Sequence, residues 1–153
     1  MTENFDITPM TDDFLPSVVA LEESCGLNSR GVDGYRKLLS KPTAVLLVVL
    51  PISPMSPISP IGLFSGEIVI DELQIDNLAV SERYRRQGIG GTLLNAALKV
   101  AASLGARSAT LEVRSANAPA ISFYVKERFT PVGLRKRYYA NPPDDALILL
   151  RKI

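Results

Sequence analysis

The segment from Gln87 to Gly105 is the feature that most constrains the fold of this chain. Its apolar residues recur at the spacing of one helix face, and Gly105 stands where a C-terminal cap belongs. The segments on either side, Leu73 to Val80 and Ser108 to Arg114, have the apolar pattern of strands. A strand–helix–strand unit of this kind predicts an α/β fold.

The rest of the chain adds strands and helices around this unit. Before it, we expect a short strand at Phe5–Thr8, helices at Thr11–Cys25 and Gly31–Ser40, and strands at Ala44–Leu50 and Ile61–Asp71. The first of these helices has Thr11 or Asp12 as its expected N-cap. After it, we expect a helix from Ala118 to about Arg128, capped by Asn117, and a hairpin of Val132–Tyr139 and Ala146–Lys152.

The stretch from Pro51 to Pro60 has proline at every third position, which predicts a loop between two strands. Its prolines also argue against a membrane helix over the apolar run from Ala44 to Phe64. The first ten residues are polar and acidic, unlike a signal peptide. With 153 residues and no linker or repeat, we predict one domain, residues 1–153.

Composition excludes several functions. There are 17 Lys and Arg against 16 Asp and Glu, so direct nucleic-acid binding through a basic excess is not expected. The absence of histidine excludes Ser-His-Asp catalysis and most zinc sites, and we expect no metal. The single cysteine, Cys25, cannot form an internal disulfide, which suits the cytoplasm. Because histidine is absent, any general base must be Asp, Glu, Lys, Tyr or the backbone.

A glycine-containing turn precedes the long helix and predicts an anion site. Free N–H groups and the positive end of the helix dipole meet there, and glycines allow a ligand to approach the backbone. A Walker loop would need a lysine after the glycines, and a Rossmann fingerprint would need glycine at Leu93. A plain helix start remains the alternative. The residues of the turn are Arg85, Arg86, Gln87, Gly88, Ile89, Gly90 and Gly91.

The strand before this turn changes phase. Leu73 and Ile75 are apolar at odd positions, whereas Leu78 and Val80 are apolar at even ones. One extra residue between Asp76 and Leu78, a β-bulge, would produce this shift. A strand buried on both faces is the alternative.

Glu112 and Tyr124 are the candidates for proton transfer. Glu112 lies on the polar side of an alternating strand, where a cross-strand ion pair is the alternative role. Tyr124 follows Asn117 by seven residues on the expected helix, where core packing is the alternative.

Four segments together resemble a known family. Leu111 to Tyr124, Asp76 to Val80, Arg85 to Gly90 and Arg135 to Tyr139 are similar to the GNAT N-acetyltransferases, in particular the RimI-type ribosomal-protein alanine N-acetyltransferases. The resemblance covers about residues 67 to 153. It implies a mixed central sheet with a splayed parallel pair flanked by helices, and acetyl transfer from acetyl-CoA to a primary amine.

The resemblance also implies roles for individual residues. Glu112 would be the general base and Tyr124 the general acid, in a direct transfer without a covalent enzyme intermediate. Asn117, Tyr124, the turn from Arg85 to Gly91 and the strand residues Leu78, Ala79 and Val80 would contact the cofactor. Tyr138 and Tyr139 are the candidates for the acceptor side.

The acceptor that the resemblance implies is the N-terminal α-amine of a protein, with the alanine of a ribosomal protein as the leading candidate. A polyamine or antibiotic amine is the alternative within the same chemistry. A non-catalytic acyl-CoA-binding module and a proline-loop interaction protein are alternatives of other classes. We expect no membrane partner, and either a monomer or a homodimer.

Overall fold

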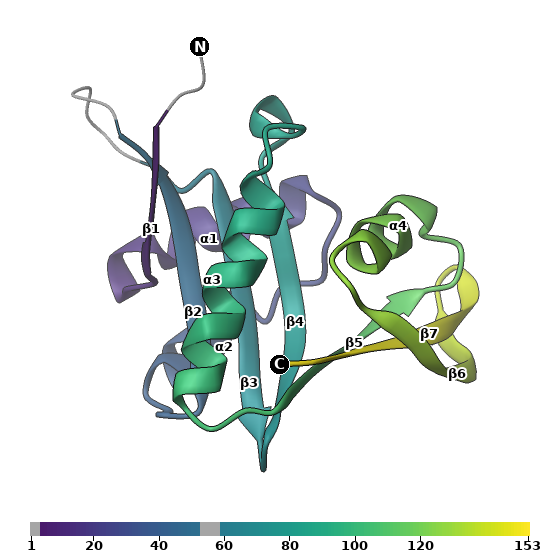
Figure 1. Cartoon of the computed structure of the whole chain (residues 1–153). Coiled ribbons are helices and arrows are strands. Elements are labelled where there is room, and N and C mark those ends of the chain that lie inside the picture. The colour runs from purple at the N-terminus through teal and green to yellow at the C-terminus, as the bar shows by residue number, and fades with distance from the viewer. Residues whose placement is uncertain (1–3, 53–58) are drawn as a thin grey trace.

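The computed structural model describes residues 4–52 and 59–153 and contains a seven-stranded sheet in the order β1-β2-β3-β4-β5-β7-β6 (Figure 1). Neighbouring strands are antiparallel except for β4 and β5, which are parallel. The strands are β1 (Phe5–Pro9), β2 (Ala44–Pro51), β3 (Gly62–Val69), β4 (Glu72–Val80), β5 (Ser108–Arg114), β6 (Thr130–Ala140) and β7 (Pro143–Lys152). The helices are α1 (Leu15–Ser24), α2 (Gly31–Leu39), α3 (Ile89–Ser103) and α4 (Ala118–Lys126).

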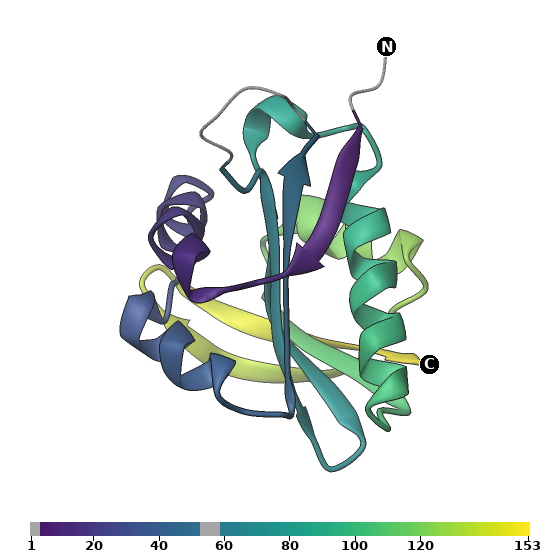
Figure 2. The same cartoon turned by 90° about the vertical axis from the view of Figure 1, so that its left-hand side faces the viewer.

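Helices cover both faces of the sheet. Figure 2 shows α1 and α2 on one side of the strands and α3 on the other. Each side has its own apolar cluster: Leu93 and Leu94 of α3 belong to one, and Leu15 and Val18 of α1 belong to the other. The prediction of a mixed sheet flanked by helices is therefore confirmed.

The predicted elements are present, with differences at their ends. The α-helix expected from Thr11 begins at Leu15, because a 3₁₀ turn at Asp12–Phe14 precedes it, and neither Thr11 nor Asp12 caps it. The long helix begins at Ile89 rather than Gln87, and Gly105 follows its last residues with φ +99°, as a C-terminal cap does. The closing strands extend beyond their predicted ends, because the chain turns only at Asn141 and Pro142.

Two further predictions concern the chain between β2 and β3. Most of the predicted proline loop, residues 53–58, lies outside the described residues, while Pro51 ends β2 and Pro60 is buried. Within the described ranges, no helix combines the length and the apolar character that a bilayer crossing requires.

Candidate active site

A bulge in β4 is the centre of the candidate site. Ser65 pairs with Asn77 and the next residue, Gly66, pairs with Ile75, so Asp76 is the extra residue. Leu73 and Ile75 before the bulge and Leu78 after it therefore contact the same apolar cluster on the α3 side. The predicted bulge is confirmed, and the strand buried on both faces is not found.

Strands β4 and β5 separate at this bulge. Their parallel pairing includes only three residue pairs, from Glu72 with Ser108 to Gln74 with Thr110. Beyond Gln74, β5 diverges from β4, whereas its other edge stays paired with β7 from Ser108 to Arg114 (Figure 1). We use the name gap for the region in which β4, after Gln74, and β5 are no longer paired.

The amide groups of Leu78 and Val80 face the gap. Successive amides of a strand point to opposite edges. The Ser81 N–H donates to the Ile61 carbonyl oxygen at 2.7 Å, which lies toward β3, so the Val80 and Leu78 amides point to the other edge. Because β5 has already diverged there, it supplies no strand partner to these amides. Among the three predicted strand contacts, Ala79 differs, because its amide points to β3 and its side chain packs on the α1 side.

The predicted anion turn leads directly into α3. Arg86 and Gly88 both have left-handed backbone conformations, with φ +64° and +78°, and α3 begins at Ile89. Glycine adopts this conformation without steric cost, so Gly88 suits the residue before the helix. The first amides of α3 have no partner within the helix, as in any helix start.

The turn, the bulge and α4 meet at Gly90. A Cβ atom on Gly90 would lie 3.3 Å from Phe123 of α4 and 3.8 Å from Leu78 of β4. A Cβ atom on the next residue, Gly91, would lie 2.8 Å from the Glu127 carboxylate. The two glycines therefore allow the first turn of α3 to pack closely against α4 and, at Gly90, against Leu78 of β4.

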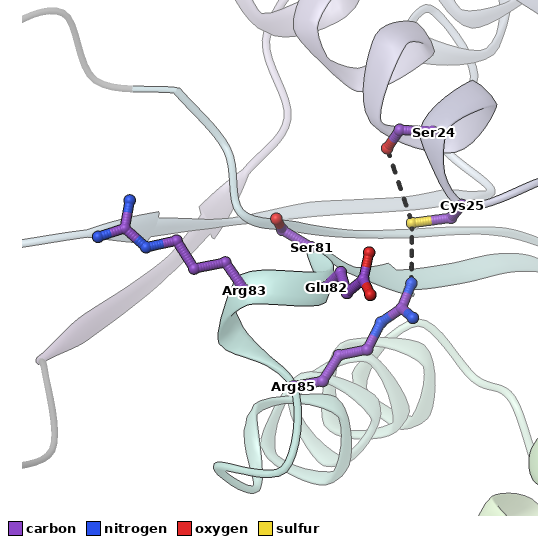
Figure 3. A pocket seen from close by; sticks show the side chains of 6 residues that line it. All are labelled: Ser24, Cys25, Ser81, Glu82, Arg83 and Arg85. Atoms are coloured by element: carbon purple, nitrogen blue, oxygen red, sulfur yellow. Dashed lines mark hydrogen bonds between the residues drawn. The ribbon is translucent and has the colours of Figure 1, made fainter.

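The Arg85 side chain turns to the α1 side of the molecule. Its Nε donates to the Val80 carbonyl oxygen at 3.0 Å, and its Nη2 lies 3.4 Å from the sulfur of Cys25. Figure 3 shows both side chains beside an open hollow of about 490 Å³ that Ser24, Ser81, Glu82 and Arg83 also line. Arg85 thus links the end of β4 to Cys25, the residue that directly follows α1.

Glu112 lies on β5 with its side chain on the face opposite the α3 cluster. Leu111 and Val113 point into that cluster, so Glu112 between them points away from it. Its carboxylate pairs with Arg135 of β6, with 3.0 Å between Oε1 and Nε, and its side chain is 31% exposed. The cross-strand ion pair that was the alternative is therefore present.

Two tyrosines of β6 lie near Glu112. A hydrogen bond to the Glu112 carboxylate is the main cause that raises the pKa of the Tyr138 hydroxyl. Burial raises the pKa of Tyr139, and the Glu112 charge adds to that effect. The Arg114 guanidinium stacks over the Tyr139 ring at 4.1 Å. The predicted acceptor-side residues thus lie beside the predicted base.

Tyr124 of α4 lies on the α3 side of β5, so the predicted acid and base are on opposite faces of the strand. Its ring packs edge-on against Phe123 and Phe129, and it is 8% exposed. Burial raises the pKa of its hydroxyl well above its usual value, so the phenol keeps its proton at neutral pH. Asn117 caps α4 as predicted, because its side-chain oxygen accepts from the Ala120 N–H at 3.3 Å.

Sequence patterns missed two parts of the site. The partner of Glu112, Arg135, comes from a strand that reaches Glu112 across β7. Glu22 of α1 is fully buried and bonds to Asn77 at the bulge. A glutamate within an apolar helix stripe was the one local signal for the second contact.

Comparisons with known proteins agree with this geometry. The model of the acetyltransferase (GNAT) family matches residues 57–129. A Bacillus subtilis protein with the provisional name ribosomal protein bS18-alanine N-acetyltransferase is 37% identical over 75% of this chain and 73% of its own length. The Escherichia coli protein of that activity is 35% identical over 54% of this chain, a stretch that spans 57% of its own length.

Solved structures share the fold. The crystal structure of the ribosomal-protein alanine N-acetyltransferase from Escherichia coli has a TM-score of 0.82 and covers 98% of this chain and 94% of its own, at 23% identity. Arabidopsis thaliana NAA60 in complex with acetyl-CoA has a TM-score of 0.86 at 18% identity and covers 98% and 99% of the two chains. At these identities the likeness shows the fold alone.

The chain belongs to the GNAT family of acetyltransferases. It is an acetyl-CoA-dependent N-acetyltransferase, as the resemblance of its four segments implied. The edge of β4 at Leu78 and Val80, which β5 does not pair, and the first turn of α3 both offer main-chain N–H groups, the kind of donor that binds a carbonyl oxygen and a diphosphate.

Proposed function

We propose that this enzyme acetylates the N-terminal α-amine of a protein, with Glu112 as general base and Tyr124 as general acid. The observation that carries the proposal is the placement of these two residues on opposite faces of β5, at the strand that borders the gap. An amine can then approach from the Glu112 face while the sulfur leaves toward the Tyr124 face.

Main-chain donors would hold the cofactor along the gap. The Leu78 or Val80 N–H would donate to the acetyl carbonyl oxygen, because both amides point into the gap without a strand partner. The amides of residues 86–91 would bind the diphosphate at the positive end of α3. Asn117 would contact the same cofactor from the start of α4. Acetyl-CoA supplies the thioester whose acyl group is transferred.

The environments of the two side chains support the proposed acid–base roles. An α-amine has a pKa of about 8, so it carries a proton at neutral pH and must lose it before attack. Arg135 pairs with the Glu112 carboxylate on the exposed face, where the carboxylate can accept that proton. Tyr124 stays protonated, so its hydroxyl can donate a hydrogen bond to the departing thiolate, and transfer of the same proton would be its role as general acid.

A protein N-terminus is the acceptor that we favour over a small amine. Its support is the pair of tyrosines beside Glu112, of which Tyr138 is 52% exposed and can contact a peptide. The named activity of the relatives from Bacillus subtilis and Escherichia coli makes the alanine of ribosomal protein bS18 the leading candidate. Such a reaction belongs in the cytoplasm, where ribosomes are made.

The test uses one peptide in two forms. Both begin with Ala and contain an internal Lys, and one has its α-amine blocked; each is incubated with acetyl-CoA and enzyme beside a separate spermidine sample. Mass spectrometry should find acetyl on the free α-amine alone, and the variant Glu112→Gln should show little product. Acetyl on spermidine alone would favour the small-amine alternative, and coenzyme A binding without any product would favour a binding module.

A further inference from the structure

Glu22 is a buried carboxylate to which the acetyl-transfer chemistry gives no task. It lies near the end of α1 with 0% of its surface exposed, within the apolar cluster between α1, α2 and the sheet. A carboxylate in such a place needs hydrogen-bond donors, because burial without them is very unfavourable. The three donors that Glu22 has come from three different parts of the fold.

Those donors connect the helices to the sheet. The Ser29 hydroxyl donates to Oε1 at 2.7 Å, from the segment between α1 and α2. The Tyr35 hydroxyl donates to Oε2 at 2.7 Å from α2, and the Asn77 side-chain amide donates to the same oxygen at 2.5 Å from β4. Two donors lie in regular elements, α2 and β4, and the third lies in the segment between the two helices, so all three together set the position of the carboxylate.

Asn77 is the residue that directly follows the bulged Asp76. Its side-chain amide also donates to the Asn28 carbonyl oxygen at 2.9 Å, and Asp76 forms an ion pair with Arg30. The bulge is therefore bonded on the α1 side by the segment of residues 28–30 as well as by Glu22. We call these contacts the Glu22 network.

The network acts on the peptide group that would bind the acetyl carbonyl. The Leu78 N–H belongs to the peptide bond between Asn77 and Leu78, so fixing the Asn77 side chain on one face fixes the direction of that N–H toward the gap. A donor for a carbonyl oxygen must be held within a few tenths of an ångström to be effective. A bulge is a local break in the ladder, so β3 alone holds this peptide less firmly than it holds a regular strand.

We propose that Glu22 is a positioning residue that acts through Asn77: it aims the Leu78 amide into the gap and holds the segment of residues 28–30 against the bulge. This inference rests on the proposed function, because it concerns the same site. The same bonds join the Leu78 peptide to the segment of residues 28–30 on the α1 side of the sheet.

The experiment compares four variants of the whole chain. Asn77→Ala and Glu22→Leu remove the link, whereas Glu22→Gln keeps it, because a glutamine oxygen can accept from Tyr35 and Asn77 while its NH₂ donates to Ser29. Arg36→Ala is the matched control, since Arg36 ties α2 to Asp12 by an exposed ion pair away from the bulge. Each variant is characterised by thermal unfolding, by calorimetry with coenzyme A, by kcat and KM, and by the NMR amide resonance of Leu78.

We expect Asn77→Ala and Glu22→Leu to lower kcat at least about tenfold while their affinity for coenzyme A changes less than about threefold, because only the aim of the carbonyl donor is lost. The Leu78 amide resonance should move in Glu22→Leu, where the substitution is far from Leu78 along the chain. Glu22→Gln and Arg36→Ala should keep kcat and the resonance near the wild-type values. Should Glu22→Leu not fold, Asn77→Ala, at a half-buried position, decides the question.

Folded Asn77→Ala with wild-type kcat would overturn the inference, as would Glu22→Gln that is as inactive as Glu22→Leu. These outcomes are distinct from failure of the proposed function. If the wild-type enzyme acetylates no α-amine, the Leu78 resonance and the affinity for coenzyme A still report whether Glu22 and Asn77 set the position of that amide.

Discussion

Replacing Gly66 with alanine should distort the bulge at the centre of the candidate site. Gly66 lies on β3 where the register shifts, and a Cβ atom there would be 2.8 Å from the Gln74 carbonyl oxygen and 3.1 Å from a Leu73 methyl carbon. The first of these contacts is with backbone, which cannot rotate away, so β3 and β4 must move apart by a few tenths of an ångström. Gln74 is also the last residue of β4 that pairs with β5, so the movement reaches the start of the gap.

Overpacking of this kind costs about 1–3 kcal/mol, and we expect the free energy of unfolding in urea to fall by that amount in Gly66→Ala. Because the Leu78 amide is displaced with its strand, kcat should fall about tenfold or more at a temperature where the variant is folded. The measurements are urea unfolding followed by fluorescence or circular dichroism, and acetyl transfer under saturating substrates.

Gly105→Ala is the matched control for this prediction. Gly105 has φ +99° with nothing within 4 Å of an added Cβ, so the variant suffers backbone strain without a clash. That strain costs about 1–2 kcal/mol, close to the cost expected for Gly66→Ala, but at the far end of α3. Equal losses of stability with kcat lowered only in Gly66→Ala support the reasoning; an unchanged kcat in both refutes it.

Three further outcomes are expected. Glu112→Gln should lower kcat at least about tenfold and leave the affinity for coenzyme A, measured by calorimetry, almost unchanged, because the general base is lost but the gap is intact; equal loss of both would contradict this. Burial raises the Tyr124 pKa in the folded state, so the stability it contributes is complete below the unfolded pKa of about 10 and is lost as pH rises further. The free energy of unfolding of Tyr124→Phe, measured by urea titration, should therefore fall less steeply than that of wild type between neutral and strongly alkaline pH. The same pH dependence in both proteins would show that ionisation of Tyr124 does not contribute to the loss of stability. Gly88→Val should weaken coenzyme A binding about tenfold, because a β-branched residue disfavours φ +78° and the turn before α3 must change; unchanged affinity would remove that turn from the diphosphate site.

Local patterns in the sequence predicted the parts of the site that depend on near neighbours. The phase change between Ile75 and Leu78 located the bulge, because one extra residue reverses the alternation of a strand. The cap at Asn117 followed from its position before an apolar helix, and the structure confirms its side-chain bond. The general form of the fold followed from the strand–helix–strand order around α3.

Contacts between distant segments were beyond such patterns. Strand β7 lies between β5 and β6, so Arg135 reaches Glu112 only after the chain has folded back across it. Glu22 and Asn77 are 55 residues apart and meet because α1 packs under the bulge. The start of α1 at Leu15 has a local reason: Pro16 has no N–H to donate to the Asp12 carbonyl oxygen, so it suits the first turn of a helix and not its interior. The roles of the site residues and the single-domain organisation stay predictions.

An NMR titration of the ¹⁵N-labelled protein with coenzyme A tests the proposed cofactor site most directly. We expect the amide resonances of Leu78, Val80 and residues 86–91 to shift together at one affinity, because one extended ligand lies along the gap and ends at α3. Shifts confined to other parts of the chain, or none at millimolar ligand, would show that the divergence of β4 and β5 does not form the cofactor site.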